Sequence, residues 1–354
     1  MNKNALCCEG ITPIYPKNGD TVELTDELVL QFVNGYTVGS SVKYAFRGDC
    51  YAPKALKLIW QGRSEKGFKV SIGCEADLSD ACTYYADSTE IEIHTHFLKK
   101  TVYWQVTPVC DCAPQKNPIF TFNLARFTET VYIEGVSNTR DIGGFLGLNG
   151  KTIGRGLVYR GSCLDGITDA GKAFCRDVLR LKAVLDLRND GEGSADEELS
   201  PLGVGVKHLH VGGCMYTGNN WSGVAHVGKE GVDIPEGMRK VVAELSAFED
   251  KENLPIYTHC VLGRDRTGTL IVMLLALCGV KREDILRDYE LSFFSKTGCG
   301  ENTPVEAIIS YVQKVFEYLD TYPGQTLCDK TVSYLKQAGM TDLQIEKIRS
   351  NLLV

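Results

Sequence analysis

The chain has 354 residues, a formal net charge of -7 at neutral pH, and the apolar and charged fractions of an ordinary soluble globular protein. The length exceeds what one hydrophobic core usually serves, so we expect two domains. The negative charge argues against a general nucleic-acid or anionic-membrane binder, because such partners require a basic surface. No apolar run approaches the ~20 residues that span a bilayer.

The amino-terminal residues 1–8 show no charged segment leading into an apolar stretch. We therefore expect a cytoplasmic protein, with secretion as the alternative if an export signal has been removed. The 14 cysteines are scattered, which favours free thiols in a reducing compartment. Cys110 and Cys112, with Cys7 and Cys8, could bind a metal, but their spacing lacks a second pair or a histidine. We expect no metal and no cofactor.

Residues 1–127 are predicted to form an all-β domain. Short runs in which apolar and polar residues alternate recur between turn signals, as in half-buried strands of a sandwich. The alternating residues are Leu56, Leu58 and Trp60; Phe68, Val70 and Ile72; Ile91 and Ile93; Val102, Trp104 and Val106; and Phe120, Phe122 and Leu124. The segment 97–106, FLKKTVYWQV, resembles the E-to-F corner of a fibronectin type III domain, an immunoglobulin-like sandwich. The resemblance covers roughly residues 10–125 and implies that Trp60 is a core tryptophan.

From residue 128 to residue 354 the pattern becomes that of an α/β domain. Residues 182–187, KAVLDL, form a continuous apolar run of the kind buried in a parallel sheet, and they follow a predicted helix over 169–181. A second buried strand is predicted over 255–258. The sequence therefore favours a central, mostly parallel sheet flanked by helices.

Three more helices are predicted in this part of the chain. The apolar segment 267–277 is one of them. Thr303 and Glu306 have the spacing of a capping box at the start of the second, and Thr341 and Gln344 have it at the start of the last.

The residues with the clearest chemical meaning lie between the second buried strand and the helix that follows it. Residues 259–268 read HCVLGRDRTG. A loop that enters a helix amino terminus gathers unpaired N–H groups and the positive end of the helix dipole, so it suits a phosphate dianion. The same field favours the thiolate form of a cysteine, which makes Cys260 the candidate nucleophile. Arg266 can hold two phosphate oxygens with its planar fork, and Gly263 and Gly268 let the backbone approach the ligand.

This loop matches the Cys-x5-Arg signature of the protein tyrosine phosphatase superfamily. It resembles most closely a bacterial branch whose loop reads HCxxGKDRTG and whose domain opens with N-x-R-D-x-G-G. The further matching residues are Asn138, Arg140, Asp141, Gly143 and Gly144; Gly156, Tyr159, Arg160, Ser162 and Leu164; Asp186, Leu187, Arg188 and Glu192; and residues 288–292, DYELS. The resemblance implies a compact phosphatase domain that acts on phosphotyrosine and, in some members, on phosphoserine, phosphothreonine or phosphoinositides.

The resemblance also implies a two-step mechanism. Cys260 attacks phosphorus to give a cysteinyl-phosphate, while Arg266 and the loop N–H groups hold the equatorial oxygens. Asp265 protonates the departing oxygen and later acts as base on the attacking water. Thr267 is expected to stabilise the thiolate as it leaves.

Two departures from familiar phosphatases leave alternatives open. The branch has lysine where this chain has Arg264, whose guanidinium either touches substrate or lies on a solvated face. No W-P-D acid follows the predicted strand over 207–211. Asp265 is therefore the leading acid, and Asp233 is the alternative because the glycine-rich segment 212–237 could form a lid.

Several supporting roles are expected around the nucleophile. His259 is expected to order the loop rather than to transfer a proton. Arg140 and Asp141 are expected either to form an ion pair beneath the loop or to contact phosphate, and Asp186 and Arg188 to act as scaffolding. The expected phosphate- and substrate-binding residues are Val261, Leu262, Gly263, Arg264, Gly268, Arg140 and Asp141.

Three functions remain open at this stage. The first is a phosphatase acting on phosphotyrosine in proteins, and the second is a phosphoinositide or inositol phosphate phosphatase, which a basic pocket around Arg264 would favour. The third is a module that binds phosphorylated ligands without turnover, and the presence of Cys260, Asp265 and Arg266 together argues against it. The role of the predicted sandwich is undecided, because fold alone does not give function.

Overall fold

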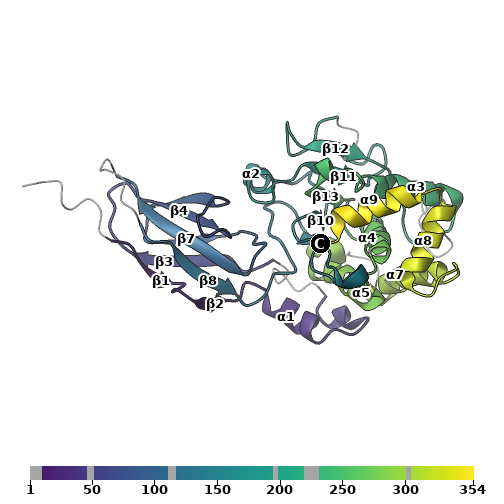
Figure 1. The fold of residues 1–354 in the computed structure, drawn as a ribbon, viewed down its shortest axis with the longest axis horizontal. Helices are drawn as coiled ribbons and strands as arrows, with labels where there is room; N and C mark the ends of the chain where they lie inside the picture. The colour runs from purple at the N-terminus through teal and green to yellow at the C-terminus, as the bar shows by residue number, and fades with distance from the viewer. Residues whose placement is uncertain (1–9, 46–51, 111–116, 194–197, 219–230, 300–303) are drawn as a thin grey trace, which may run out of the picture. The chain divides into compact units, whose positions relative to one another are not determined.

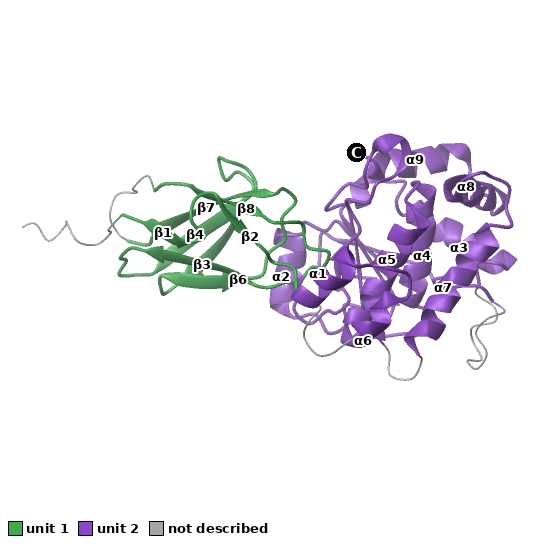
Figure 2. Ribbon diagram, turned by 90° about the horizontal axis from the view of Figure 1, so that it is seen from below, with its two compact units in different colours: residues 1–26, 53–131 green, residues 27–52, 132–354 purple. Residues whose placement is uncertain are grey.

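A computed structural model describes residues 10–45, 52–110, 117–193, 198–218, 231–299 and 304–354. The chain divides into two compact units (Figure 2): unit 1 comprises Met1–Asp26 and Pro53–Val131, and unit 2 comprises Glu27–Ala52 and Tyr132–Val354. The predicted boundary at residue 127 lies close to the second junction. The division differs from the prediction for residues 27–52, which we placed in the first domain and which fall in unit 2.

Unit 1 consists of two β-sheets. Its strands are β1 (Thr12–Tyr15), β2 (Asp20–Val22), β3 (Leu56–Gln61), β4 (Phe68–Gly73), β5 (Cys82–Ala86), β6 (Glu90–Ile93), β7 (Thr101–Pro108) and β8 (Phe120–Leu124). One sheet has the strand order β1-β3-β6, and the other has the order β2-β8-β7-β4-β5. Neighbouring strands are antiparallel except β2 and β8, which run parallel.

The core of unit 1 follows the alternation in the sequence. Each of the five alternating runs forms a strand, and the apolar side chains of both sheets pack into one cluster. Trp60 of β3 and Trp104 of β7 are both almost fully buried in it. β1, β2 and β5 were not predicted, because these strands are short or have no deeply buried residue.

Unit 2 is built on a five-stranded sheet of order β12-β11-β13-β10-β9. Its strands are β9 (Arg140–Asp141), β10 (Val158–Gly161), β11 (Ala183–Asp186), β12 (Lys207–His210) and β13 (Ile256–His259). β10, β11, β12 and β13 are parallel, and only β9 runs antiparallel to its neighbour. Gly161 and Asp186 both pair in register with His259, so the carboxyl ends of β10 and β11 meet where the loop begins.

Helices cover this sheet. They are α1 (Glu27–Asn34), α2 (Asp169–Asp177), α3 (Pro235–Ser246), α4 (Asp265–Leu277), α5 (Arg282–Glu290), α6 (Lys296–Cys299), α7 (Val305–Leu319), α8 (Leu327–Gln337) and α9 (Asp342–Leu352), with short 3₁₀ turns at 40–43, 148–150, 251–253 and 291–294. α4 lies in the centre of the unit and packs against α3, α5 and α8, with α2 on the other side of the sheet (Figure 1). This central position explains why residues 270–277 of α4 are all apolar and buried.

The ends of the helices test the capping predictions. The capping box of Thr341 and Gln344 opens α9 as expected. The first residue of α7 follows Pro304, which is its N-cap, while Thr303 lies outside the described residues. α4 begins at Asp265, two residues earlier than predicted, and it ends before Gly279, whose φ is 81°.

The segment around α1 is anchored in unit 2. Phe32 is fully buried, and its ring lies 4.9 Å from the ring of Phe294. The buried carboxylate of Glu290 accepts hydrogen bonds from the Tyr36 hydroxyl at 2.9 Å and from the Gly39 N–H at 2.8 Å. It also accepts one from the Ser41 hydroxyl at 2.6 Å. These contacts explain why the described residues 27–45 belong to unit 2.

In the described part of the chain, no helix has both the length and the apolar character that a bilayer crossing needs. The cysteines described there form no disulfide. Of the cysteines that we considered as metal ligands, Cys7, Cys8 and Cys112 lie outside the described residues. Cys110 is partly buried.

Candidate active site

The candidate nucleophile lies in a tight turn between β13 and α4. Cys260 is buried, with an exposure of 2%. Gly263 has a φ of 68°, a left-handed conformation that favours glycine. A Cβ atom at Gly263 would collide with the carbonyl oxygen of Gly161. Glycine is therefore required here both by conformation and by space.

The carbonyl groups of the turn are held away from its inner side. Three successive carbonyls accept hydrogen bonds from donors outside the turn: Val261 from the Cys163 N–H at 3.0 Å, Leu262 from the Asn138 amide at 2.9 Å and Gly263 from Arg160 at 2.8 Å. Carbonyl and N–H of a trans peptide point in opposite directions. The N–H groups of residues 262–264 therefore point inward, where they can bind an anion together with the amino terminus of α4.

Arg266 is held by a carboxylate of the loop that follows β11. Its guanidinium donates to both oxygens of Glu192, at 2.6 Å and 3.4 Å, and to the carbonyl of Leu187 at 3.3 Å. Partial burial opposes the charged carboxylate, but the hydrogen bonds from Arg266 hold the pKa of Glu192 below its usual value. This pairing fixes the orientation of the guanidinium fork.

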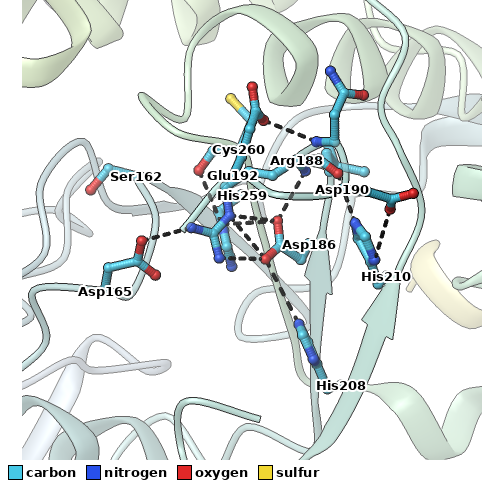
Figure 3. Close-up of polar contacts among 12 residues, drawn as sticks. Ser162, Asp165, Asp186, Arg188, Asp190, Glu192, His208, His210, His259 and Cys260 are labelled. Atoms are coloured by element: carbon cyan, nitrogen blue, oxygen red, sulfur yellow. Dashed lines mark hydrogen bonds and ion pairs between the residues drawn. The ribbon is translucent and has the colours of Figure 1, made fainter. Parts of the chain in front are cut away.

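Asp186, at the end of β11, is the centre of a buried network beneath the nucleophile (Figure 3). It accepts hydrogen bonds from the Arg188 guanidinium at 2.7 Å and 3.0 Å, and its oxygens lie 3.7 Å from His208 and His259. Burial opposes ionisation, yet the His208 and Arg188 hydrogen bonds hold the pKa of Asp186 well below its ordinary value. These contacts agree with the expected scaffolding role.

His259 lies directly beside the nucleophile. Its Nδ1 is 3.0 Å from the carbonyl oxygen of Cys260, and the ring is fully buried. Burial lowers the pKa of His259, so the neutral imidazole is favoured at neutral pH. This geometry supports a role in ordering the turn.

Arg264 points away from the nucleophile. Its side chain is 6% exposed, and it donates to Asp265 at 2.9 Å and to the carbonyls of Gly298 and Cys299 at 2.7 Å and 3.2 Å. Both alternatives that we considered, contact with substrate and a solvated face, were wrong. The reason is that the fork of arginine can satisfy several buried acceptors at once, which a lysine cannot do in the same geometry.

Asp265 has two buried partners. One is Arg264, and the other is the hydroxyl of Tyr216, which donates to Asp265 Oδ1 at 2.6 Å. The Tyr216 hydroxyl also contacts that of Tyr289 on α5. The Asp265 side chain retains 13% exposure. Tyr216 could not be identified from the sequence, because a single tyrosine outside the motif carries no local signal.

Arg140 lies behind the turn. Its side chain is 1% exposed and donates to Asp288 at 2.8 Å and to the Asn138 side chain at 2.7 Å. Asp288 also pairs with Arg160 at 2.6 Å. The structure contradicts phosphate contact by Arg140, since Asn138 and Arg160 are the residues that hold the turn and Arg140 supports them from behind.

Asp141 has a local structural role. Its two oxygens accept hydrogen bonds from the N–H groups of Gly143 and Gly156, each at 2.8 Å. The carboxylate thereby links the turn at Gly143 to the turn at Gly156. Its placement among the phosphate-binding residues was wrong for the same reason as that of Arg140: both side chains are buried and occupied.

Four other expected site residues differ in their surroundings. The Thr267 hydroxyl is buried and has no hydrogen-bond partner in the part of the chain that the structure describes. Val261 is 40% exposed at the rim of the turn. Gly268 packs so closely on the ring of Tyr289 that a Cβ atom would overlap it at 2.5 Å. Asp233 accepts the Gly218 N–H at 2.6 Å, and both residues lie within the predicted lid 212–237, of which residues 219–230 lie outside the described ranges.

Comparison with known proteins assigns the chain to a class, the cysteine-based phosphatases. A model described as the tyrosine phosphatase family matches residues 131–354, more than half of the chain. The chain belongs to this family.

One curated relative is a protein of Cupriavidus necator named as a candidate tyrosine-protein phosphatase. It is 28% identical over 168 residues, which make up 44% of this chain and 59% of the relative. The chain thus spans less than two thirds of that relative. Among solved structures, the core catalytic domain of the PP-IP phosphatase SIW14 from S. cerevisiae is similar at 20% identity and a TM-score of 0.29, covering 47% of this chain and 90% of that one. A similarity of this extent does not bear on function.

Proposed function

We propose that this protein hydrolyses phosphomonoesters through a cysteinyl-phosphate, with phosphotyrosine in proteins as the substrate. One observation carries the proposal: the turn that holds Cys260 has its carbonyls tied outward by Asn138 and Arg160, so that its N–H groups surround the position of a bound phosphate. Arg266, oriented by Glu192, supplies the charge that the transferred phosphoryl group requires.

The chemistry runs in two steps. The Cys260 thiolate forms a bond to phosphorus as the ester P–O bond breaks, and the departing oxygen takes a proton from Asp265. A water molecule then gives its proton to Asp265 and attacks phosphorus, which releases the thiolate and inorganic phosphate. The buried Thr267 hydroxyl has no other partner among the described residues and can donate to the departing thiolate.

The surroundings of the turn favour phosphotyrosine over a phosphoinositide. Arg264, which would have lined a basic pocket, is buried and paired. The close-up around Cys260 contains instead the carboxylates of Asp165 and Asp190, with side-chain exposures of 37% and 94% (Figure 3). Asp165 pairs with Arg188 at 2.7 Å and so offsets the charge of that arginine. The exposed carboxylate of Asp190 disfavours a substrate that carries several phosphates, because like charges repel.

We further infer that unit 1 is a fibronectin type III-like sandwich. The support is its division into two sheets that share one core, with Trp60 buried on β3. In the larger sheet, β7 pairs antiparallel with β4 and with β8, as neighbouring strands do in such a module.

The test of the phosphatase proposal is Cys260→Ser in the full chain. Turnover of an aryl phosphate should fall to background, because the nucleophile is lost. Binding of inorganic phosphate, measured by calorimetry, should persist, because the N–H groups and Arg266 remain. Turnover near the wild-type rate would overturn the proposal.

A further inference from the structure

Tyr216 adopts a backbone conformation that a tyrosine rarely takes. Its φ is 47°. Its side chain is fully buried, although the residue lies in the loop that follows β12. A bulky residue persists in the left-handed region only where its surroundings impose it. Specific contacts must therefore hold Tyr216 in this conformation.

The surroundings that impose this conformation belong mainly to the first turns of α4. The Tyr216 N–H donates to the Thr269 hydroxyl at 3.1 Å, and the Tyr216 carbonyl accepts from Val232 at 2.7 Å. The Tyr216 hydroxyl donates to Asp265 at 2.6 Å. Backbone and side chain together thus join the loop after β12 to the residue that we propose as the acid.

The hydrogen bonds at Asp265 distinguish its two oxygens. Oδ1 accepts from Tyr216 and from Arg264 Nε at 2.6 Å and 2.9 Å. Oδ2 accepts only a longer bond, from Arg264 Nη2 at 3.3 Å, among the described hydrogen bonds. A proton on Oδ1 would interfere with the two short hydrogen bonds that this oxygen accepts from Tyr216 and Arg264. Oδ2 can carry the proton without that loss.

We propose that Tyr216 is a positioning residue that commits Oδ1 of Asp265 and leaves Oδ2 to deliver the proton. This inference rests on the proposed phosphatase function. In the step concerned, the O–H bond at Oδ2 breaks and the proton passes to the ester oxygen, which takes the electron pair of its breaking bond to phosphorus. Tyr216 itself exchanges no proton in this step.

The test compares two tyrosine-to-phenylalanine variants of the full chain. Tyr216→Phe removes the hydroxyl that holds Asp265. Tyr334→Phe is the matched control, because its buried hydroxyl donates to the Val232 carbonyl at 3.0 Å and does not reach Asp265 by any described bond. Both variants lose one buried hydroxyl near the same loop, so a general structural effect would appear in both.

For Tyr216→Phe, kcat on phosphotyrosine should fall about tenfold or more with little change in KM, since a misplaced acid weakens proton transfer and not binding. An activated aryl phosphate, whose phenolate leaves without a proton, should be affected much less. Tyr334→Phe should show no such dependence on the leaving group. Equal losses on both substrates in Tyr216→Phe, or the same pattern in both variants, would overturn the inference.

A second variant covers the case in which Tyr216→Phe does not fold. Tyr289→Phe removes the hydroxyl that contacts Tyr216 and should give a smaller loss with the same dependence on the leaving group. If Tyr289→Phe showed no dependence on the leaving group, the positioning role of Tyr216 would be wrong. Failure of the phosphatase proposal is separate, because it would show as turnover that survives Cys260→Ser.

Discussion

Two carboxylates compete for the role of general acid, and their positions distinguish them. Asp265 follows the nucleophile turn directly and opens α4, whereas Asp233 lies in the loop after β12, where it accepts the N–H of Gly218. We predict that Asp265→Asn slows hydrolysis of phosphotyrosine roughly 100-fold while an activated aryl phosphate slows much less, because only the poor leaving group needs the proton.

Asp233→Asn, measured on the same two substrates, is the comparison. It should change both rates by a similar factor, since loss of the Gly218 bond loosens the loop without removing the acid. A dependence on the leaving group in Asp233→Asn, and none in Asp265→Asn, would move the acid to the loop after β12.

Glu244 is a buried carboxyl that opposes stability at alkaline pH. Its Oε1 accepts the Cys214 N–H at 2.7 Å, and its Oε2 has no partner among the described residues. Burial raises the pKa of Glu244 to about 8, against the smaller opposing effect of the Cys214 hydrogen bond. A raised pKa of a carboxyl means that the folded state binds more protons than the unfolded chain between about pH 4.5 and 8, so stability falls as pH rises through that window.

Glu244→Gln should therefore resemble the wild type near pH 4 and become relatively more stable towards pH 8, by on the order of a few kcal/mol. Chemical denaturation at a series of pH values measures this difference. The wild type serves as the control at each pH. A difference that stays constant with pH would contradict the assignment of a neutral Glu244.

At the scale of elements, the turn between β13 and α4 depends on Gly263 for two separate reasons. One is its φ of 68°, and the other is the collision that a Cβ atom would make with Gly161. Gly150 offers a matched control, because its φ is 76° and no atom lies within 4 Å of the position of its Cβ.

We predict that Gly150→Ala costs about 1 kcal/mol, through the backbone alone, and leaves turnover unchanged. Gly263→Ala should cost more and abolish most turnover, because the peptide groups that bind phosphate must shift. Thermal unfolding and steady-state kinetics of the two variants measure both effects. Equal behaviour of the two would mean that the turn tolerates displacement.

The sequence predicted those elements whose signal is local. Alternation identified five strands of unit 1, and the continuous apolar runs identified β11 and β13, which are central in their sheet. The motif predicted Cys260 and Arg266 side by side in one turn. Short edge strands such as β9 escaped, because two residues carry no periodic pattern.

What the sequence did not reveal are partners brought together by the fold. Asp288, some 148 residues along the chain from Arg140, is the carboxylate that orients both Arg140 and Arg160. The resemblance included Asp288 in the segment DYELS but offered no pairing. Arg140 and Asp141 have partners within the fold in place of phosphate, because successive strand residues point to opposite faces and each side chain is buried on its own side.

At the scale of the whole molecule, α1 makes the stability of the phosphatase unit depend on residues far from the family match. Phe32 packs with Leu291 and Phe294 in a small cluster. We predict that Phe32→Ala destabilises unit 2 by about 3–5 kcal/mol, the usual cost of removing a buried phenylalanine ring. The temperature at which phosphatase activity is lost should fall accordingly.

Phe68→Ala, in the core of unit 1, is the control for this experiment. It removes the same side chain from the other unit, so it should lower the stability of unit 1 and leave the temperature of activity loss nearly unchanged. If Phe68→Ala and Phe32→Ala lowered that temperature equally, the assignment of α1 to unit 2 would not account for the result.

The hydrogen bonds that Tyr36, Gly39 and Ser41 donate to Glu290 have a consequence for any shortened form of this protein. The backbone passes between the units three times, after Asp26, Ala52 and Val131, so unit 2 is not one continuous piece of chain. A fragment cut at residue 131, where the family match begins, would lack Tyr36, Gly39 and Ser41. The carboxylate of Glu290 would then lose the donors that solvate it and would have to be hydrated or protonated, two positions from the Asp288 that orients the arginines behind the nucleophile.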